Sequence, residues 1–230
     1  VTEAAAIAAA EWVGRGDKES ADKASTNAMR DRLNQIDFIA EISIGEGKKD
    51  KSFGLFDGEI VGLNRERYII DCIANYSIAV DPIEGTTPTS IGGYEAMSVI
   101  ALANENCFFK TEEHYMYKIA VGPELKQMDL SNIHLHKLID LLSLFLKKPK
   151  NRLTVCLLDR ARNQDIIYDL RKTGCRIKLI QDCDVTACIA TCFPDCGIDM
   201  YIGTGGSPEA VISAAAMKCL GGSLYAFLAD

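Results

Sequence analysis

The hydrophobic pattern of the first half of the chain predicts two helices followed by a series of strands. Apolar residues recur with helical spacing in residues 2–13 and 17–36, and Asp17 follows Gly16 in a position suited to cap the second helix. Short apolar runs predict the strands, which span residues 39–44, 77–81, 96–103 and 115–121.

After Leu130 the pattern becomes a regular alternation of strands and helices. A strongly apolar helix is expected at residues 135–146. Strands are then expected at 153–158, 176–180, 199–202 and 224–228, with helices at 163–173, 184–191 and 208–220 between them. Strands separated by helices of about ten residues favour a parallel or mixed sheet covered by helices. We therefore expect an α/β fold with mixed α+β character in two domains, residues 1–135 and 136–230.

Composition and charge exclude several classes of partner. Hydrophobic residues make up 48% of the chain and charged residues 25%, as is typical of globular proteins. The net charge of −7 provides no basic surface for nucleic acid, although a phosphorylated substrate stays possible because a bound metal reverses the local charge. No apolar stretch reaches the ~20 residues of a membrane span. Nine cysteines, an odd number, are typical of a reducing compartment, so we expect a cytoplasmic protein.

Two carboxylates, Asp81 and Glu84, follow the predicted strand 77–81 within the segment Asp-Pro-Ile-Glu-Gly-Thr. Proline fixes one backbone torsion and glycine permits a sharp turn, so the segment can direct both acids inward. A carboxylate at the end of a buried strand is costly unless it is paired or binds a cation. The alternative is a plain turn with solvated acids. Oxygen ligands alone would indicate a hard cation, Mg²⁺ or Mn²⁺.

Two further acids lie in positions that are unusual for a surface carboxylate. Glu46 sits between two glycines after a predicted strand, where it is either a metal ligand or the exposed residue of a hairpin turn. Asp22 falls within the apolar stripe of the helix predicted at 17–36. An ion pair with Lys18 four residues earlier would explain Asp22, as would a role as metal ligand.

A glycine-rich segment, Gly-Thr-Gly-Gly-Ser-Pro-Glu at residues 203–209, joins a predicted strand to a predicted helix. Ser207 is the expected N-cap, and Pro208 suits the first helical turn. Free N–H groups at such a helix start favour phosphate. The dinucleotide-binding and P-loop patterns do not match, because Pro208 replaces a required glycine and no Lys-Ser/Thr pair follows. Glu209 would otherwise be an ordinary surface acid in the first turn.

Charged residues also follow the predicted strands of the second half. Arg160 and Arg162 come after one strand, and Asp182 and Asp184 after the next, where ligands of open α/β sheets gather. Arginine is shaped for bidentate contact with phosphate. The cysteines at spacing four near residue 190 could indicate a metal cluster, but ordinary buried thiols explain them better because no Cys-x-x-Cys pair is present.

Taken together, these segments resemble the class II fructose-1,6-bisphosphatase family, which includes bifunctional fructose-1,6-/sedoheptulose-1,7-bisphosphatases. The similarity runs in order through Val-Thr-Glu-Ala-Ala at residue 1, Gly-Arg-Gly-Asp-Lys at 14, Ile-Gly-Glu-Gly at 44 and Ala-Val-Asp-Pro-Ile-Glu-Gly-Thr at 79. It continues through residues 182–185 and 203–222 and so covers nearly the whole chain.

The resemblance implies a layered αβαβα sandwich of the lithium-sensitive sugar and inositol phosphatase type, with a metal-binding phosphatase domain before a sugar-phosphate-binding domain. It implies Mn²⁺- or Mg²⁺-dependent hydrolysis of the 1-phosphate of fructose-1,6-bisphosphate in gluconeogenesis, by a homo-oligomer. The implied metal ligands are Asp22, Glu46, Asp81, Glu84 and Glu209. The implied catalytic residues are Asp81, Glu84 and Thr86, with Thr86 positioning the attacking water. The implied substrate-binding residues are Glu84, Gly85, Thr86, Tyr115, Arg160, Ala161, Arg162, Asp182, Cys183, Asp184 and Gly206.

Two loops depart from the family pattern. The family usually has Arg/Lys-Pro-Arg-His where this chain has Arg-Ala-Arg-Asn from Arg160, and Asp-Gly-Asp where this chain has Asp-Cys-Asp from Asp182. Three alternatives therefore stay open: a lithium-sensitive phosphatase for inositol phosphates or a nucleotide bisphosphate, a non-catalytic sugar-phosphate sensor, and a thiol-based redox switch. The first differs in substrate, the second binds without turnover, and the third responds to dithiothreitol.

Overall fold

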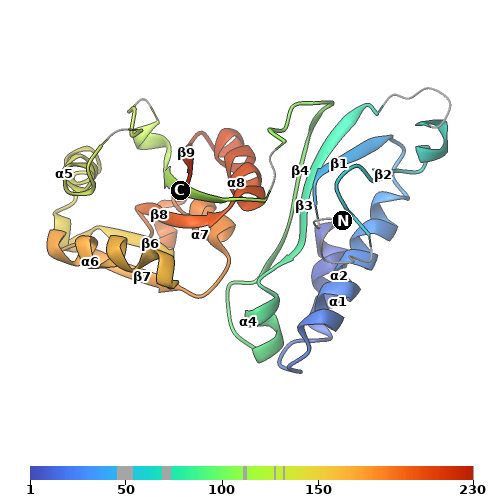
Figure 1. Cartoon of the computed structure of the whole chain (residues 1–230), viewed down its shortest axis with the longest axis horizontal. Helices are drawn as coiled ribbons and strands as arrows, with labels where there is room; N and C mark the ends of the chain where they lie inside the picture. The colour runs from blue at the N-terminus through green and yellow to red at the C-terminus, as the bar shows by residue number, and fades with distance from the viewer. Residues whose placement is uncertain (46–53, 69–73, 111–112, 127, 132, 230) are drawn as a thin grey trace. The chain divides into compact units, whose positions relative to one another are not determined.

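The computed structural model of the chain describes residues 1–45, 54–68, 74–110, 113–126, 128–131 and 133–229. The expected mixed α/β fold class is confirmed, because helices alternate with the strands of two mixed sheets. The chain divides into two compact units, Val1–Glu112 and Glu113–Asp230, which are described separately (Figure 1). Within the described residues, no helix is both long and apolar enough to cross a membrane.

The first unit is a four-stranded sheet with helices packed against it. Its strand order is β2-β1-β3-β4, with β1 parallel to β3 and the other neighbours antiparallel. Helices α1 and α2 pack against the sheet around buried residues that include Met29, Ile42 and Ile78. The element bounds are α1 Thr2–Ala10, α2 Lys18–Leu33, β1 Ala40–Ile44, β2 Ile60–Val61, η1 Arg65–Arg67, β3 Tyr76–Glu84, α4 Thr86–Ile91 and β4 Met97–Asn104.

Helix α2 begins where the sequence predicts. The Oδ1 atom of Asp17 accepts a 3.0 Å hydrogen bond from the Ser20 N–H, which confirms Asp17 as the N-cap. The helix ends at Leu33, three residues before the predicted end. At the C-terminal end of the helix, the Asn34 side chain accepts a hydrogen bond from the Gly62 N–H and so ties the helix end to the sheet.

The second unit is a five-stranded sheet with helices on both faces. Its strand order is β7-β6-β8-β5-β9, with β6 parallel to β7 and β8, and β5 antiparallel to β8 and β9. Helices α5 and α6 share one core with the sheet, and α7 and α8 share another. The bounds are β5 Tyr115–Val121, η2 Pro123–Leu125, α5 Leu135–Phe145, η3 Lys150–Arg152, β6 Thr154–Leu158, η4 Ala161–Asn163, α6 Gln164–Thr173, β7 Arg176–Ile180, α7 Asp184–Ala190, η5 Pro194–Cys196, β8 Met200–Gly206, α8 Ser207–Leu220 and β9 Ser223–Leu228.

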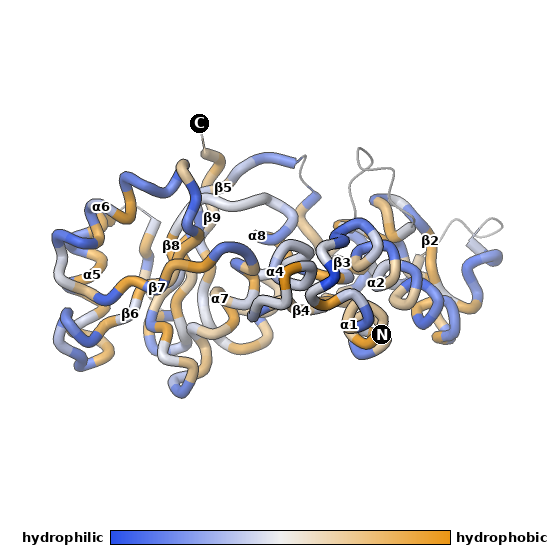
Figure 2. Tube along the Cα trace, turned by 90° about the horizontal axis from the view of Figure 1, so that it is seen from below, coloured by the Kyte–Doolittle hydropathy of each residue, from blue (hydrophilic) through white to orange (hydrophobic). Residues whose placement is uncertain are grey.

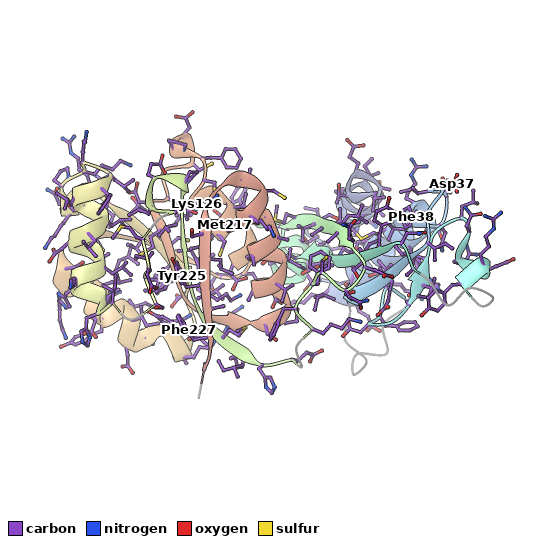
Figure 3. The ribbon with its side chains drawn as sticks, turned by 90° about the horizontal axis from the view of Figure 1, so that it is seen from above. Asp37, Phe38, Lys126, Met217, Tyr225 and Phe227 are labelled. Atoms are coloured by element: carbon purple, nitrogen blue, oxygen red, sulfur yellow. The ribbon has the colours of Figure 1, made fainter. Side chains whose placement is uncertain are left out.

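The two cores explain the near-continuous apolar strands of this unit. Both faces of β6 and β8 are covered, so these strands lack the polar alternation of a half-exposed sheet. In Figure 2 hydrophobic colour lies on β6, whose sequence is Thr-Val-Cys-Leu-Leu. Met217 on α8 belongs to one core, and Tyr225 on β9 packs against the other (Figure 3).

The boundary between the units differs from the expected division after residue 135. Strand β5 was assigned to the first domain, but it pairs over its whole length with β8 and with β9. The units therefore divide between Glu112 and Glu113. The ladder partners of β5 lie roughly a hundred residues further along the chain, and a local pattern cannot identify such partners.

Three elements near the candidate site also differ from their predictions. Strand β3 continues past Asp81 to Glu84, and β8 continues through the expected glycine loop to Gly206. Helix α4 was not among the predicted elements, since its sequence Thr-Thr-Pro-Thr-Ser-Ile contains few strong helix formers. Ser207 was predicted as an N-cap, but it is the first residue of α8 and Gly206 is the cap.

Candidate active site

The Asp81–Thr86 segment of the first unit is a bulged strand end that turns directly into a helix. The β3–β4 pairing shifts register between Asp81 and Glu84, where Pro82 has no N–H to donate. Asp81 Oδ1 accepts a 3.0 Å hydrogen bond from the Ile83 N–H. Gly85 follows with φ of 96°, a left-handed conformation that favours glycine. This backbone leaves Asp81 half-buried and Glu84 buried at the entrance to α4.

Helix α4 is fixed to the loop that precedes α2. Thr89 and Ser90 accept backbone hydrogen bonds of 2.9 and 2.8 Å from Gly14 and Gly16. The Lys18 Nζ donates a 2.8 Å hydrogen bond to Oγ1 of Thr87, next to Thr86. Lys18 therefore brings a positive charge to the start of α4, a contact that sequence reasoning missed because it considered Lys18 only as a partner for Asp22.

Asp22 lies on the helix that packs against these elements. Helix α2 contacts both β3 and α4, and Asp22 is half-buried on it. The first unit thus brings Asp22, Asp81 and Glu84 onto mutually packed elements. Among the residues that the structure describes, no three His, Cys, Asp or Glu side chains gather closely enough to form a metal site.

Glu46 falls outside the described residues, but the structure describes the residues on either side of this segment, Gly45 and those from Gly54 onward. The Gly45 N–H donates a 2.9 Å hydrogen bond to Asp57 Oδ1. A Cβ on Gly45 would lie only 2.0 Å from the Leu55 carbonyl oxygen, so only glycine fits there. The buried Glu59 accepts from the Leu55 N–H and from the Arg30 Nε, the latter at 2.5 Å.

In the second unit, two carboxylates approach the backbone where β8 meets α8. A Cβ on Gly205 would lie 2.2 Å from Asp184 Oδ2, and one on Gly206 would lie 2.1 Å from Glu209 Oε2. A side chain at position 205 would displace the carboxylate of Asp184, which Lys118 and Tyr201 hold in place, and one at position 206 would displace the end of the Glu209 side chain. The carboxylates of Asp184 and Glu209 thus lie directly against the backbone of the glycine-rich segment.

Asp184 takes part in a buried ion pair that the sequence analysis missed. Lys118 on β5 is 0% exposed and Asp184 is 4% exposed, with 2.6 Å between Nζ and Oδ2. The Tyr201 hydroxyl donates to the same oxygen at 3.2 Å. Burial lowers the pKa of Lys118, but the charge of Asp184, together with Cys188, Glu209 and the hydrogen bond to Asp184, offsets this and leaves the pKa raised. A charged residue in the middle of the apolar strand β5 was the available signal.

Glu209 has an oxygen that no described residue satisfies. The side chain as a whole is half-buried, but Oε2 is shielded from solvent and has no hydrogen-bond partner within the described part of the chain. Burial raises the pKa of Glu209, as does the nearby charge of Asp184, while Lys118 opposes both effects. An orphaned, buried carboxylate oxygen fits a divalent cation, since hard ions take oxygen ligands.

The arginines predicted to bind phosphate are held by groups of the same unit. Arg162 Nε donates a 2.8 Å hydrogen bond to the Thr204 carbonyl oxygen, and its guanidinium lies 4.5 Å from the centre of the Tyr115 ring. Arg160 lies 3.7 Å from an oxygen of Asp182. Both side chains remain partly exposed, so their remaining donors can reach an anion.

The two departures from the family pattern have clear structural consequences. Ala161 is exposed at the start of a short 3-10 helix, and the buried Asn163 ends it. Asn163 accepts a 2.8 Å hydrogen bond from the Thr204 N–H and donates a 3.1 Å hydrogen bond to the Leu158 carbonyl oxygen. It therefore ties the loop after β6 to β8. Cys183 has a left-handed φ of 69°, a conformation better suited to the glycine of the family pattern.

This arrangement defines a class: a mixed α/β protein that presents buried or half-buried carboxylates and partly exposed arginines near the ends of its strands. The family model described as "Bacterial fructose-1,6-bisphosphatase, glpX-encoded" matches residues 1–230, and the chain belongs to that family. It is 41% identical over 224 residues to the fructose-1,6-bisphosphatase 1 class 2 of Escherichia coli (strain K12), covering 97% of this chain and 65% of that protein.

A second relative gives the same picture. The chain is 41% identical over 228 residues to the fructose-1,6-bisphosphatase class 2 of Haemophilus influenzae (strain ATCC 51907 / DSM 11121 / KW20 / Rd), covering 99% of this chain and 66% of that protein. The chain thus spans 65–66% of the length of these curated relatives. The resemblance drawn from the sequence motifs is confirmed at the level of the family.

Proposed function

We propose that this chain is the catalytic part of a divalent-metal-dependent fructose-1,6-bisphosphatase, which hydrolyses the 1-phosphate of its substrate in gluconeogenesis. Family membership supports the reaction, and the names of the relatives supply the substrate. The observation that carries the proposal is the bulged end of β3, where Asp81 and Glu84 immediately precede Thr86 at the start of α4.

Asp22, Asp81 and Glu84 of the first unit would be metal ligands, as would Glu46 and, in the second unit, Glu209. Their oxygen donors and the orphaned Oε2 of Glu209 favour Mg²⁺ or Mn²⁺. When bound, such an ion lowers the pKa of a coordinated water and neutralises charge on phosphoryl oxygens.

The side chains around α4 would place the attacking water. The Thr86 hydroxyl can accept a hydrogen bond from that water and so orient it for in-line attack. The hydrogen bond between Lys18 and Thr87, together with the backbone bonds from Gly14 and Gly16, holds α4 in place. The chain's own contribution is then to fix the direction of attack.

The second unit would bind the sugar bisphosphate. Arg160 and Arg162 would contact a phosphate through charge-assisted hydrogen bonds. Asp182 and Asp184 would accept hydrogen bonds from sugar hydroxyls. The proposed substrate-binding residues are Glu84, Gly85 and Thr86 in the first unit and Tyr115, Arg160, Ala161, Arg162, Asp182, Cys183, Asp184 and Gly206 in the second.

Phosphate release from fructose-1,6-bisphosphate tests the reaction and the metal requirement together. We expect turnover with Mn²⁺ or Mg²⁺ and its loss in excess EDTA, with recovery when metal is restored. Undiminished turnover in EDTA would exclude the metal mechanism. A panel that adds sedoheptulose-1,7-bisphosphate, an inositol phosphate and a nucleotide bisphosphate determines the substrate class.

Calorimetric titration with the sugar bisphosphate separates an enzyme from a sensor. A sensor binds the sugar without releasing phosphate, whereas the proposed enzyme does both. We further propose that the protein is a cytoplasmic homo-oligomer, as its resemblance to the family implies. Light scattering after gel filtration tests the number of subunits.

A further inference from the structure

The buried ion pair of the second unit fixes the Asp184 carboxylate from two sides, and neither Lys118 nor Tyr201 has a role in the proposed function. Lys118 Nζ and the Tyr201 hydroxyl both donate to Oδ2 of Asp184, at 2.6 and 3.2 Å. The side chain of Asp184 is only 4% exposed, so this carboxylate is held inside the unit. Two donors, one on β5 and one on β8, therefore fix the position of the Oδ2 atom.

The surroundings leave this carboxylate little room to move. A Cβ on Gly205 would lie 2.2 Å from Asp184 Oδ2 and 2.9 Å from Lys118 Nζ, so the backbone of β8 closes one side. Lys118 is 0% exposed and cannot itself reach a ligand in this structure. Its ion pair with Asp184 gives it an indirect route to a bound sugar.

We infer that Lys118 and Tyr201 are positioning residues, which hold the Asp184 carboxylate so that it accepts a hydrogen bond from a hydroxyl of the sugar bisphosphate. The inference rests on the proposed function for the identity of the ligand. A carboxylate that is fixed before the ligand arrives loses less conformational freedom on binding, so its hydrogen bond contributes more to affinity. Lys118 also lies near Glu209 and balances part of the charge of two neighbouring carboxylates.

The mildest variant is Tyr201→Phe, which keeps the ring packed and removes a single donor. We expect KM for fructose-1,6-bisphosphate to rise about 3–10-fold with kcat nearly unchanged, since a ground-state contact is weakened. The matched control is Tyr168→Phe on α6, where the tyrosine is exposed and the hydroxyl lies outside the proposed site. The control should leave both constants unchanged.

A double-mutant cycle tests whether Lys118 acts through Asp184. Lys118→Met leaves a buried carboxylate without its cation and should lower the unfolding midpoint as well as raise KM. Lys118→Met/Asp184→Asn has no buried ion pair, so it should recover much of the stability. If Lys118 acts through Asp184, the double variant has the same KM as Asp184→Asn alone.

The outcomes separate this inference from the proposed function. A KM that is unchanged in Tyr201→Phe, or a Lys118→Met effect that is equally large with and without Asp184, overturns the positioning role and leaves the phosphatase intact. A purely structural role predicts altered unfolding midpoints with wild-type KM in every folded variant. A wild-type chain that neither binds nor hydrolyses the sugar bisphosphate overturns both proposals.

Discussion

The two units hold an aspartate in opposite ways, Asp81 in strand β3 of the first unit and Asp184 at the start of helix α7 in the second. Asp81 in the first unit is half-buried and accepts a hydrogen bond from the backbone two residues ahead. Asp184 in the second unit is buried and depends on a lysine 66 residues away. The first arrangement is local and close to water, whereas the second exists only when β5, β8 and α7 have assembled.

The difference separates function from stability. An acid held by its own turn can be removed at little cost to the fold, because water replaces its interactions. An acid that neutralises a buried lysine cannot, because its removal leaves an uncompensated charge in a low-dielectric interior. The same substitution should therefore affect mainly catalysis in the first unit and mainly folding in the second.

The largest effect is expected for Asp81→Ala, measured as phosphate release. Loss of a metal ligand removes several kcal/mol of transition-state stabilisation, so kcat/KM should fall roughly 10³-fold or more. Thermal unfolding of the metal-free protein should change little. Asp81→Asn is the matched control, because its amide oxygen still accepts from the Ile83 N–H while the charge is lost. Activity within tenfold of wild type in both variants would contradict the assignment of Asp81.

Asp184→Ala should show the opposite balance. It leaves Lys118 buried without its partner, so we expect the free energy of unfolding in urea to fall by about 3–5 kcal/mol. Asp169→Ala on α6 is the control, because Asp169 pairs with Lys172 at the surface and such pairs contribute at most about 1 kcal/mol. Equal effects of the two substitutions would show that burial does not distinguish them.

Asn163 shows what a buried side chain without charge contributes, for comparison with the buried charge of Asp184. This buried amide bridges Leu158 and Thr204 without carrying a charge. Asn163→Ala leaves the Thr204 N–H without its acceptor and should cost about 1–3 kcal/mol, less than the loss of Asp184. Gln164→Ala on the adjacent exposed position serves as the control. A cost as large as that of Asp184→Ala would mean that the buried charge of Asp184 adds nothing.

The sequence predicted what is local in each unit. Strands β5 and β7 have the predicted bounds, and Asp17 caps α2 because its serine partner lies three residues ahead. The acids of the candidate site were also recognisable, since their neighbours are glycines and prolines with definite backbone requirements.

What the sequence did not predict depends on distant partners. The structural role of Lys118 depends on its contact with Asp184, which Tyr201 shares, and no periodicity in the sequence relates these three positions. The structural role of Asn163 likewise depends on its hydrogen bond with Thr204, 41 residues later. Helix α4 has weak helix formers and is held by the backbone of Gly14 and Gly16, so tertiary contacts override its propensity.

The smallest expected effect concerns the N-cap of α2, the helix that carries Lys18 and Asp22. Hydrogen bonds from Ser20 hold the pKa of Asp17 below its ordinary value of 3.8, so this carboxylate stabilises the fold above that pH. At pH 7, Asp17→Ala should lower Tm by roughly 2–4 °C. Asp17→Asn should stay near wild type, because asparagine caps without titrating.

The pH dependence of that difference follows from the direction of the pKa shift. Because the folded-state pKa is lowered, the stabilising contribution is lost as the pH falls through it, and the Tm gap between wild type and Asp17→Ala should shrink below pH 3.8. A gap that stays constant at the lowest pH would show that the carboxylate charge plays no part in the cap. Asp17 would then stabilise the first unit through hydrogen-bond geometry alone, and the contrast with the charge-dependent pair of the second unit would become sharper.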